Sequence, residues 1–411
     1  MAKVFPFRAY RYDATAEPLE HLLTQPYDKI TPEMRARYLS LSPHNLVRII
    51  LGERTPSDGP GNNVYTRAAA LLNDWVSLGV LRRDPDPSLF AYFQEFCVPD
   101  TGERLVRRGF IGLGAVEDYS AGVVYRHEQT LSGPKQDRLE LLRHTRAHFG
   151  QIFMLYPDPQ AQVDQQLDEC AEAPPAAVIT DEYGATHRLW KIADAGRISR
   201  IGSLMADKKL LIADGHHRYE TALAFRNENP GIAGATRVMM TFVNMHSPGL
   251  KILATHRLVN GLASFDGDEF LRRVTKTFEV QPLRSPEDLK TIWSNASPGM
   301  IGVAIGDRLY LLTPHDAGDK LDVSVLHEDV LRDVMGIGEE AVRAEKNLRY
   351  VRGLDKAIEA ARSGQAQIAF LLRPTSIEDV ARISFGGGVM PQKSTDFYPK
   401  LLSGFTIYAL D

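Results

Sequence analysis

The sequence predicts a mixed α/β fold with more than one domain. The chain has 411 residues, which is enough for two or three domains. Its hydrophobic fraction of 44% is normal for a globular protein, so we expect a substantial core. Short β-like runs alternate with stretches of helical apolar spacing along the chain, which is typical of α/β architecture.

Residues 1–157 are predicted to form an N-terminal α/β domain. Residues 65–80 carry apolar side chains at helical spacing. The runs at 89–98 and 104–116 are β-like, and the residues between them are typical of a hairpin turn. The other elements expected here are a strand at 45–51, a helix at 137–149 with Asp137 as a candidate cap, and a short strand at 151–156.

Residues 175–262 are predicted as a second domain, because a Pro/Ala-rich patch at 172–177 marks a joint. Within it the apolar run at 210–213 stops at Asp214 and Gly215 and passes into good helix formers, which predicts a buried strand that turns sharply into a helix. The other elements expected here are a hairpin at 177–180 and 186–192, a helix at 198–206, and strands at 237–245 and 250–256.

Residues 263–411 are predicted as a C-terminal α/β domain. The segment ends in a tail at 384–400 that is first Gly-rich and then polar. Its expected helices lie at 269–278, 323–334 and 353–362, and its expected strands at 300–305, 308–313 and 367–372.

Composition argues against several classes of protein. The net charge of −4 shows no basic excess, so no nucleic-acid partner is expected. The two cysteines, Cys97 and Cys170, form no C-x-x-C pair, which fits a reducing compartment and predicts no zinc site. The first residues form no apolar signal segment, and no uncharged run approaches membrane-spanning length. We therefore expect a soluble cytoplasmic protein without a membrane partner.

The strongest functional candidate is the run from Asp214 through Gly215, His216 and His217 to Arg218. A helix that starts here offers free N–H groups and a positive dipole end, which bind phosphate or carboxylate. Asp214 would face such a ligand from the end of the strand. The alternative is a helix capped by Asp214 with solvated histidines. We interpret Asp214 as catalytic and the four residues after it as phosphate-binding.

A second polar cluster precedes the predicted helix at 137–149. His127 and Glu128 pair an imidazole with a carboxylate, the usual material of acid–base catalysis. Lys135 and Arg138 follow and suit an anionic substrate. The alternative is an ordinary charged loop. The chain lacks H-E-x-x-H at this point, so a zinc-protease site is excluded and no metal-ligating residue is predicted.

The polar tail superficially resembles a P-loop. The residue before Lys393 is Gln392, where a P-loop needs glycine, and Pro391 removes one N–H, so this is not a P-loop. Lys393, Ser394 and Thr395 still suit a phosphate contact, with an ordinary surface loop as the alternative. The weaker candidates, assigned to a substrate cleft, are Arg8, Tyr27, Asp28, His256 and Arg257.

Several blocks of the sequence, spread over nearly the whole length of the chain, resemble those of the DUF1015 family of uncharacterised bacterial and archaeal proteins. The resemblance does not by itself imply an activity. The blocks that carry it are 5–9, 26–28, 45–48, 127–130 with 133–139, 213–222, 255–257, and 390–395 with 397–400.

The run from Asp214 to Arg218, with Ala222, is also similar to the G-x-H-R-x-x-A signature of the ParB/sulfiredoxin-like fold. That resemblance implies a central strand–turn–helix module in which Gly215, His217 and Arg218 touch nucleotide phosphates. Free-serine kinases of this superfamily imply a catalytic role for Asp214. Sulfiredoxin chemistry is excluded, because the cysteine it requires is replaced here by His216.

Three functions are compatible with these motifs. The first is a nucleotide-dependent kinase of a small hydroxylated metabolite, serine being the leading candidate, with ATP, ADP or CTP as the nucleotide and Mg²⁺ bound to it. The second is a nucleotide-binding regulatory protein without turnover. The third is a phosphatase in which His127 and Asp214 activate water. The oligomeric state is left open.

Overall fold

The chain forms two compact units, Met1–Lys251 with Pro399–Asp411, and Ile252–Tyr398. Both units combine β-sheets with helices, so the predicted mixed α/β, multi-domain fold is confirmed. The computed structural model describes residues 1–13, 17–128, 132–294, 297–316, 318 and 320–410.

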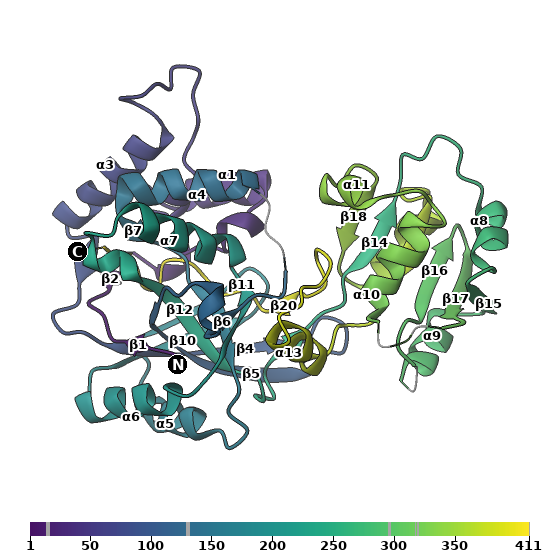
Figure 1. The fold of residues 1–411 in the computed structure, drawn as a ribbon. Coiled ribbons are helices and arrows are strands. Elements are labelled where there is room, and N and C mark those ends of the chain that lie inside the picture. The colour runs from purple at the N-terminus through teal and green to yellow at the C-terminus, as the bar shows by residue number, and fades with distance from the viewer. Residues whose placement is uncertain (14–16, 129–131, 295–296, 317, 319, 411) are drawn as a thin grey trace. The chain divides into compact units, whose positions relative to one another are not determined.

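A nine-stranded mixed sheet forms the centre of the first unit (Figure 1). Across the sheet, its strands are β6 (Val124–Tyr125), β11 (Leu210–Asp214), β8 (Ile152–Tyr156), β12 (Arg237–Asn244), β5 (Arg104–Ala115), β4 (Leu89–Cys97), β10 (Thr186–Ile192) and β9 (Ala177–Thr180), with β1 (Val4–Phe5) paired to β5. Strand β8 runs parallel to β12 and antiparallel to β11. Every residue of β8 is buried, as expected where helices cover both faces of a sheet.

Helices α4 (Ser132–Thr145) and α7 (His216–Glu228) cover one face of this sheet, and α5 (Gln162–Ala171) and α6 (Ala195–Met205) cover the other (Figure 1). The start of α6 is capped by a residue type that favours this position, because the Asp194 side chain accepts the Arg197 N–H. The remaining helices are α1 (Pro32–Leu41), α2 (Val47–Ile50), α3 (Val64–Ser77) and the short turns η1 (Leu19–His21), η2 (Tyr27–Lys29), η3 (Tyr119–Ala121) and η4 (Ala233–Thr236). Small two-stranded sheets join β2 (Tyr10–Tyr12) to β3 (Leu81–Arg83) and β7 (Ala147–His148) to β21 (Tyr408–Ala409).

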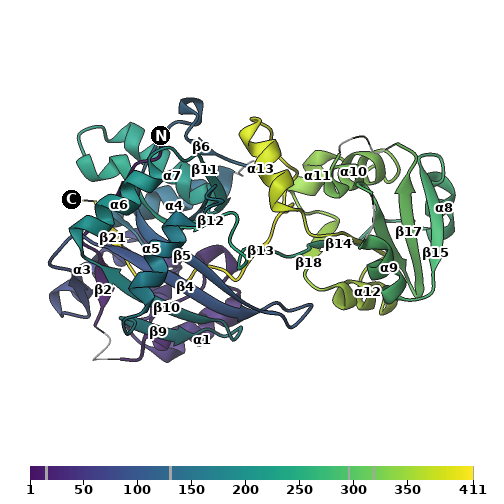
Figure 2. The ribbon, with the colours of Figure 1, turned by 90° about the horizontal axis from the view of Figure 1, so that it is seen from below.

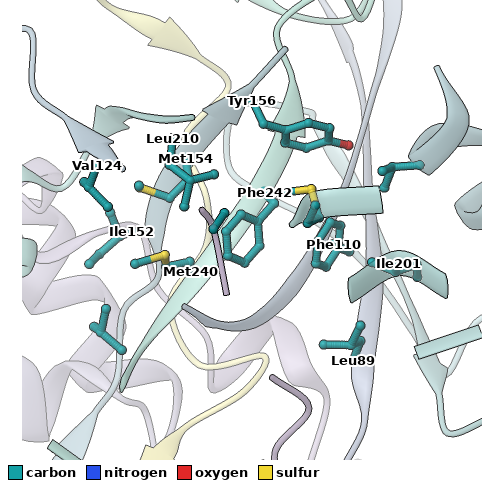
Figure 3. Packing of buried hydrophobic residues seen from close by; sticks show 14 of the residues in the cluster. Leu89, Phe110, Val124, Ile152, Met154, Tyr156, Ile201, Leu210, Met240 and Phe242 are labelled. Atoms are coloured by element: carbon teal, nitrogen blue, oxygen red, sulfur yellow. The ribbon is translucent and has the colours of Figure 1, made fainter. Parts of the chain in front are cut away.

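The core of the first unit holds β11 and β8 firmly in place. Figure 3 shows Met154 and Leu210 packed together, with Phe110 and Phe242 beside them. The two phenylalanine rings stack with centroids 4.9 Å apart. The polar residues at the ends of these strands are therefore carried on a rigid, close-packed support.

The second unit is built on a six-stranded antiparallel sheet (Figure 2). Its order is β15 (Phe278–Leu283), β17 (Arg308–Pro314), β16 (Ile301–Ile305), β19 (Ile368–Leu371), β14 (His256–Val259) and β18 (Leu348–Val351). Helices α9 (Pro286–Trp293) and α12 (Leu354–Arg362) pack on one face, and α8 (Gly267–Val274) and α10 (Asp322–Val325) on the other. Its further elements are η5 (Leu326–Arg332), α11 (Glu339–Arg343), α13 (Ile377–Phe385) and β20 (Phe397–Tyr398), and β13 (Lys251–Ile252) lies where the chain enters this unit.

Two predicted elements need correction, one in its type and one in its length. The run 45–51 contains helix α2 instead of a strand, because the Asn45 side chain accepts the Val47 N–H at 2.9 Å and starts a helical turn. An apolar run of this length cannot be assigned from periodicity alone. The helix expected at 269–278 ends at Val274, and Phe278 begins β15.

Two other expectations are changed by the structure. Asp137 does not cap α4, because the helix already begins at Ser132, and Asp137 instead accepts the Tyr65 hydroxyl at 2.9 Å. The predicted division into domains at 1–157, 175–262 and 263–411 differs from the division into the two compact units described above. Strands of the first two segments alternate in one sheet, since β11 lies between β6 and β8.

Candidate functional site

The strand–turn–helix predicted around Asp214 is present. Strand β11 ends at Asp214, Gly215 makes the turn with φ 93°, and α7 begins at His216. A Cβ on residue 215 would lie 3.0 Å from the guanidinium of Arg218. Glycine therefore serves two purposes here: it adopts the left-handed conformation, and it leaves space for Arg218 to fold back over the turn.

Asp214 lies between two basic side chains. Arg218 donates to its Oδ2 at 2.8 Å, and the Nζ of Lys400 lies 3.6 Å from its Oδ1. Burial by itself raises the pKa of Asp214, but the charges of Lys400, Arg218 and Lys29 outweigh burial and hold this pKa well below its ordinary value. Asp214 is therefore ionised at neutral pH.

A narrow cavity of about 60 Å³ adjoins Arg218. Tyr27, Arg138, Thr221 and Ser403 are among the residues that line it. The Arg138 guanidinium lies 4.3 Å from the centre of the Tyr27 ring. Thr221 is buried, and its hydroxyl finds no hydrogen-bond partner among the described residues. The cavity has room for a small polar group but not for a nucleotide.

His127 and His216 form a buried pair beside the turn. The Nδ1 of His127 donates to the Ile212 carbonyl at 2.8 Å, so its Nε2 is left as an acceptor. The two rings meet edge to face, with centroids 4.6 Å apart. Burial lowers the pKa of His127 to about 4 and lowers that of His216 as well. Both rings are neutral at pH 7, and the Nε2 of His216 has no partner within the described chain.

Further cations gather on the His216 side of α7. Glu220, one turn later on the same face, lies 3.5 Å from Arg126 and 3.6 Å from the Nζ of Lys135. Arg126 also contributes to the lowered pKa of His216. The first turn of α7 is thus flanked by basic residues on both sides, which favours an anion.

Many of the predicted site residues meet at the start of α7. Asp214, Gly215, His216 and Arg218 form the turn, and His217 follows on α7, half-buried. Glu128 is half-buried next to His127, while Gln129 and Thr130 of the same motif lie outside the described residues. Contacts link four other predicted residues to this turn: His127, Lys135, Arg138 and Tyr27. Asp28 follows Tyr27 in the chain, and its carboxylate lies 3.6 Å from the Nζ of Lys29.

Other predicted residues lie elsewhere. Arg8 is exposed and donates to the Asp84 carbonyl at 3.1 Å. The second unit contains His256, Arg257, Lys393, Ser394 and Thr395. A single site that includes these five residues stays a prediction, and the site described here belongs to the first unit.

Sequence reasoning missed two cations that face Asp214. Lys400 ends the block 397–400 that was matched to the family, so its place in a distinctive polar tail was a signal. Lys29 directly follows Asp28. Neither could be assigned to Asp214 from the sequence, because chain positions 186 residues apart (400 − 214) meet only through the tertiary fold.

Comparisons with known proteins place the chain in a family. The model of a family described as "Protein of unknown function (DUF1015)" matches residues 4–331. A search of curated proteins gives no match. Among the described helices, none combines the length and apolar character needed to cross a membrane.

Solved structures with a similar course of the chain include a variant of a free serine kinase in complex with AMP. It is 14% identical, with 70% of this chain and 88% of that chain covered and a TM-score of 0.40. A conserved hypothetical protein from Pyrococcus furiosus is 15% identical (67% and 87% covered, TM-score 0.35), and C-terminally truncated SbnI from Staphylococcus aureus is 12% identical (71% and 85% covered, TM-score 0.37). At these TM-scores we infer neither fold nor function from the likeness.

Proposed function

This chain belongs to the DUF1015 family, and from that premise we propose that it is a nucleotide-dependent phosphotransferase acting on a small hydroxylated metabolite, free serine being the leading candidate. One observation carries the proposal. The carboxylate of Asp214 is kept ionised between Arg218 and Lys400 at the N-terminus of a helix. Phosphoryl transfer requires this combination of positioning and charge neutralisation more than it requires covalent chemistry.

The residues divide into two roles. Arg218, Lys400 and the first N–H groups of α7 hold the phosphates and offset the negative charge that develops during transfer. Asp214 accepts the hydrogen bond of the acceptor hydroxyl and orients its oxygen toward the terminal phosphorus. Because the pKa of Asp214 is low, it positions this hydroxyl rather than storing its proton, which passes on to water. The acceptor oxygen forms a bond to the terminal phosphorus as the bond from that phosphorus to the bridging oxygen breaks, and the shortened nucleotide leaves.

The choice of a nucleotide rests on the similarity of the Asp214–Arg218 run to the ParB/sulfiredoxin-like signature. In the described part of the chain, no group of three or more His, Cys, Asp or Glu side chains is arranged to hold a metal ion. Mg²⁺ commonly binds as a complex with nucleotide phosphates, and the proposal takes it to be supplied in that form.

Phosphorus NMR tests the proposal. The purified protein is incubated with Mg²⁺, with ATP, ADP and CTP in turn, and with a pool of hydroxylated metabolites that contains serine. We expect a new phosphomonoester signal that grows as one nucleotide is consumed. An unchanged spectrum with nucleotide still bound would replace the proposal by a regulatory binding protein, and inorganic phosphate alone would replace it by a phosphatase.

A further inference from the structure

The second unit contains a cavity of about 500 Å³. This volume lies in the range of sites that bind small molecules. All its lining residues belong to the second unit, so it shares no residue with the site at Asp214. Ten of its fifteen described lining residues have polar or charged side chains, while the walls also expose apolar atoms.

The cavity opens at one edge of the six-stranded sheet. Strands β14 and β19 are antiparallel neighbours, so the beginning of β14 and the end of β19 lie at the same edge. Thr255, just before β14, and Arg373, just after β19, both line the cavity. Ser376, the cap of α13, and Asp322, the first residue of α10, complete the wall.

Basic residues outnumber acidic residues in the lining. The four cations are Arg257, Lys320, Arg373 and Arg382, and the two carboxylates are Asp322 and Asp379. Each carboxylate already has its own arginine. Asp322 accepts two hydrogen bonds of 2.8 Å from Arg373, and Asp379 accepts one of 2.7 Å from Arg382. Lys320 also has carboxylate partners, Glu328 at 2.9 Å and Asp329 at 3.4 Å, which offset its charge. The planar guanidinium groups of the three arginines, rather than an excess of positive charge, therefore favour an anion.

These contacts also fix the cations in place. The bidentate pair with Asp322 fixes the plane of the Arg373 guanidinium. Arg257 is buried and donates to the Lys393 carbonyl at 2.9 Å. The loop that carries this carbonyl is tied to the wall, because the Thr375 hydroxyl donates to the Ser394 carbonyl at 2.8 Å. Cations held in this way lose little freedom when they bind a ligand.

The other lining groups narrow the class of ligand. Four lining residues carry hydroxyl groups: Thr255, Thr375, Ser376 and Ser394. Three of these hydroxyls already donate a hydrogen bond, Thr375 to the Ser394 carbonyl, Ser376 to Asp379 and Ser394 to the Pro391 carbonyl. Ser376 caps α13, so the start of this helix lies at the cavity. No aromatic residue is among the described residues that line the cavity, so a nucleobase would find no ring on which to stack. Arginine forks and hydroxyls match the planar or tetrahedral oxygens of carboxylate and phosphate.

We propose that this cavity is a binding site for a small aliphatic anion, a phosphate monoester or a polycarboxylate. The site would operate independently of the phosphotransferase proposed for the first unit, as a place where a metabolite is sensed or held. Arg373 and Arg257 would bind the anionic group inside the cavity. Lys320 and Arg382, which are about half exposed, would contact it at the rim.

Isothermal titration calorimetry of the full chain tests the proposal with glycerol 3-phosphate and tricarballylate as probes. The test variant carries Lys320→Gln and Arg382→Gln. Its matched control carries Lys290→Gln and Arg362→Gln. The exposed fractions of the control side chains, 55% and 57%, match the 46% and 56% of Lys320 and Arg382, and all four pair with carboxylates of the same unit. We expect at least one probe to bind the wild type and the control, and the test variant to bind it at least about tenfold more weakly.

An Arg218→Gln variant separates this site from the one in the first unit. The proposal requires that Arg218→Gln leave the affinity for the aliphatic probe unchanged. If Arg218→Gln abolishes binding and the variant with Lys320→Gln and Arg382→Gln does not, the anion binds at α7 and the proposal is overturned. It is also overturned if neither probe binds the wild type at millimolar concentration. Loss of binding in the control variant would contradict it too. The phosphotransferase proposal would survive any of these results.

Discussion

Two aspartates near opposite ends of strand β8 have opposite electrostatic settings. At one end Asp214 of β11 pairs with Phe153 and faces Arg218 and Lys400. At the other end, beyond Tyr156, Asp164 accepts the Asn244 amide at 3.1 Å. Burial raises the pKa of both carboxyl groups, yet the net pKa of Asp214 falls and that of Asp164 rises. At Asp214 the nearby cations outweigh burial, whereas at Asp164 burial is the largest cause and sets the direction of the shift.

This difference separates an anion site from a structural cluster. Near Asp164 the neighbouring Asp158 raises the pKa further, and the Tyr156 hydroxyl has no hydrogen-bond partner among the described residues. The Asp164 carboxyl group therefore holds its proton more tightly than an exposed one, and Arg108 offsets only part of this effect. Asp214 is ionised, and Arg218 and Lys400 beside it supply the positive charge that favours a bound phosphate. Only the Asp214 end of β8 therefore has the charges that a phosphoryl-transfer site needs.

The largest expected effect comes from Asp214→Asn. It removes the charge that orients the acceptor, so we expect turnover to fall by about 10²- to 10⁴-fold while nucleotide binding is retained. The measurement is phosphomonoester formation by NMR beside nucleotide affinity by calorimetry. Asp84→Asn is the matched control, because Asp84 is also buried between an arginine and a lysine, Arg11 at 2.9 Å and Lys191 at 3.2 Å. Equal losses of binding and turnover in Asp214→Asn would contradict its catalytic role.

Arg218→Gln should weaken nucleotide binding by about ten- to a hundredfold, because one charge-assisted contact to phosphate is lost. Arg226→Gln, near the other end of α7, is the control. Arg226 also holds an aspartate, Asp118, at 2.8 Å but lies away from the helix start. The measurement is the affinity of each variant for ADP by isothermal titration calorimetry. Similar affinities in both variants would show that phosphate does not bind at the start of α7.

Gly215→Ala should destabilise the protein by more than the roughly 1–2 kcal/mol that a left-handed alanine costs. The added Cβ would also press on the Arg218 guanidinium, 3.0 Å away. Gly184→Ala isolates the backbone cost, since Gly184 has φ 81° and no atom within 4 Å of the added Cβ. Urea unfolding measures both. If the two variants lose the same stability, Arg218 is not packed against the turn.

The smallest effect concerns Asp164. Its pKa is raised in the folded state, so its contribution to stability is full below its unfolded pKa of about 3.9 and is lost as pH rises through the folded pKa. The free energy of unfolding should therefore fall less between pH 4 and pH 7 in Asp164→Asn than in the wild type. Urea unfolding at both pH values measures this. A steeper loss in the variant would contradict the raised pKa.

The part of the site predicted from the sequence is the part that is local in the chain. The change from a buried apolar run to Asp214 and Gly215 is a local signal, and it predicted β11, the turn and α7 correctly. The strand expected at 45–51 failed because a side-chain hydrogen bond from Asn45 overrides an ambiguous apolar run. Lys400 and Lys29 were out of reach, since their nearness to Asp214 is created by packing between distant segments.

The most direct test of the phosphate site is a crystal structure of the protein with ADP and Mg²⁺. We expect phosphate oxygens within hydrogen-bond distance of the N–H groups at the start of α7 and of the Arg218 guanidinium, with the Asp214 carboxylate facing the terminal phosphate. Phosphates bound away from this turn, with Asp214 still closed onto Arg218 and Lys400, would contradict it.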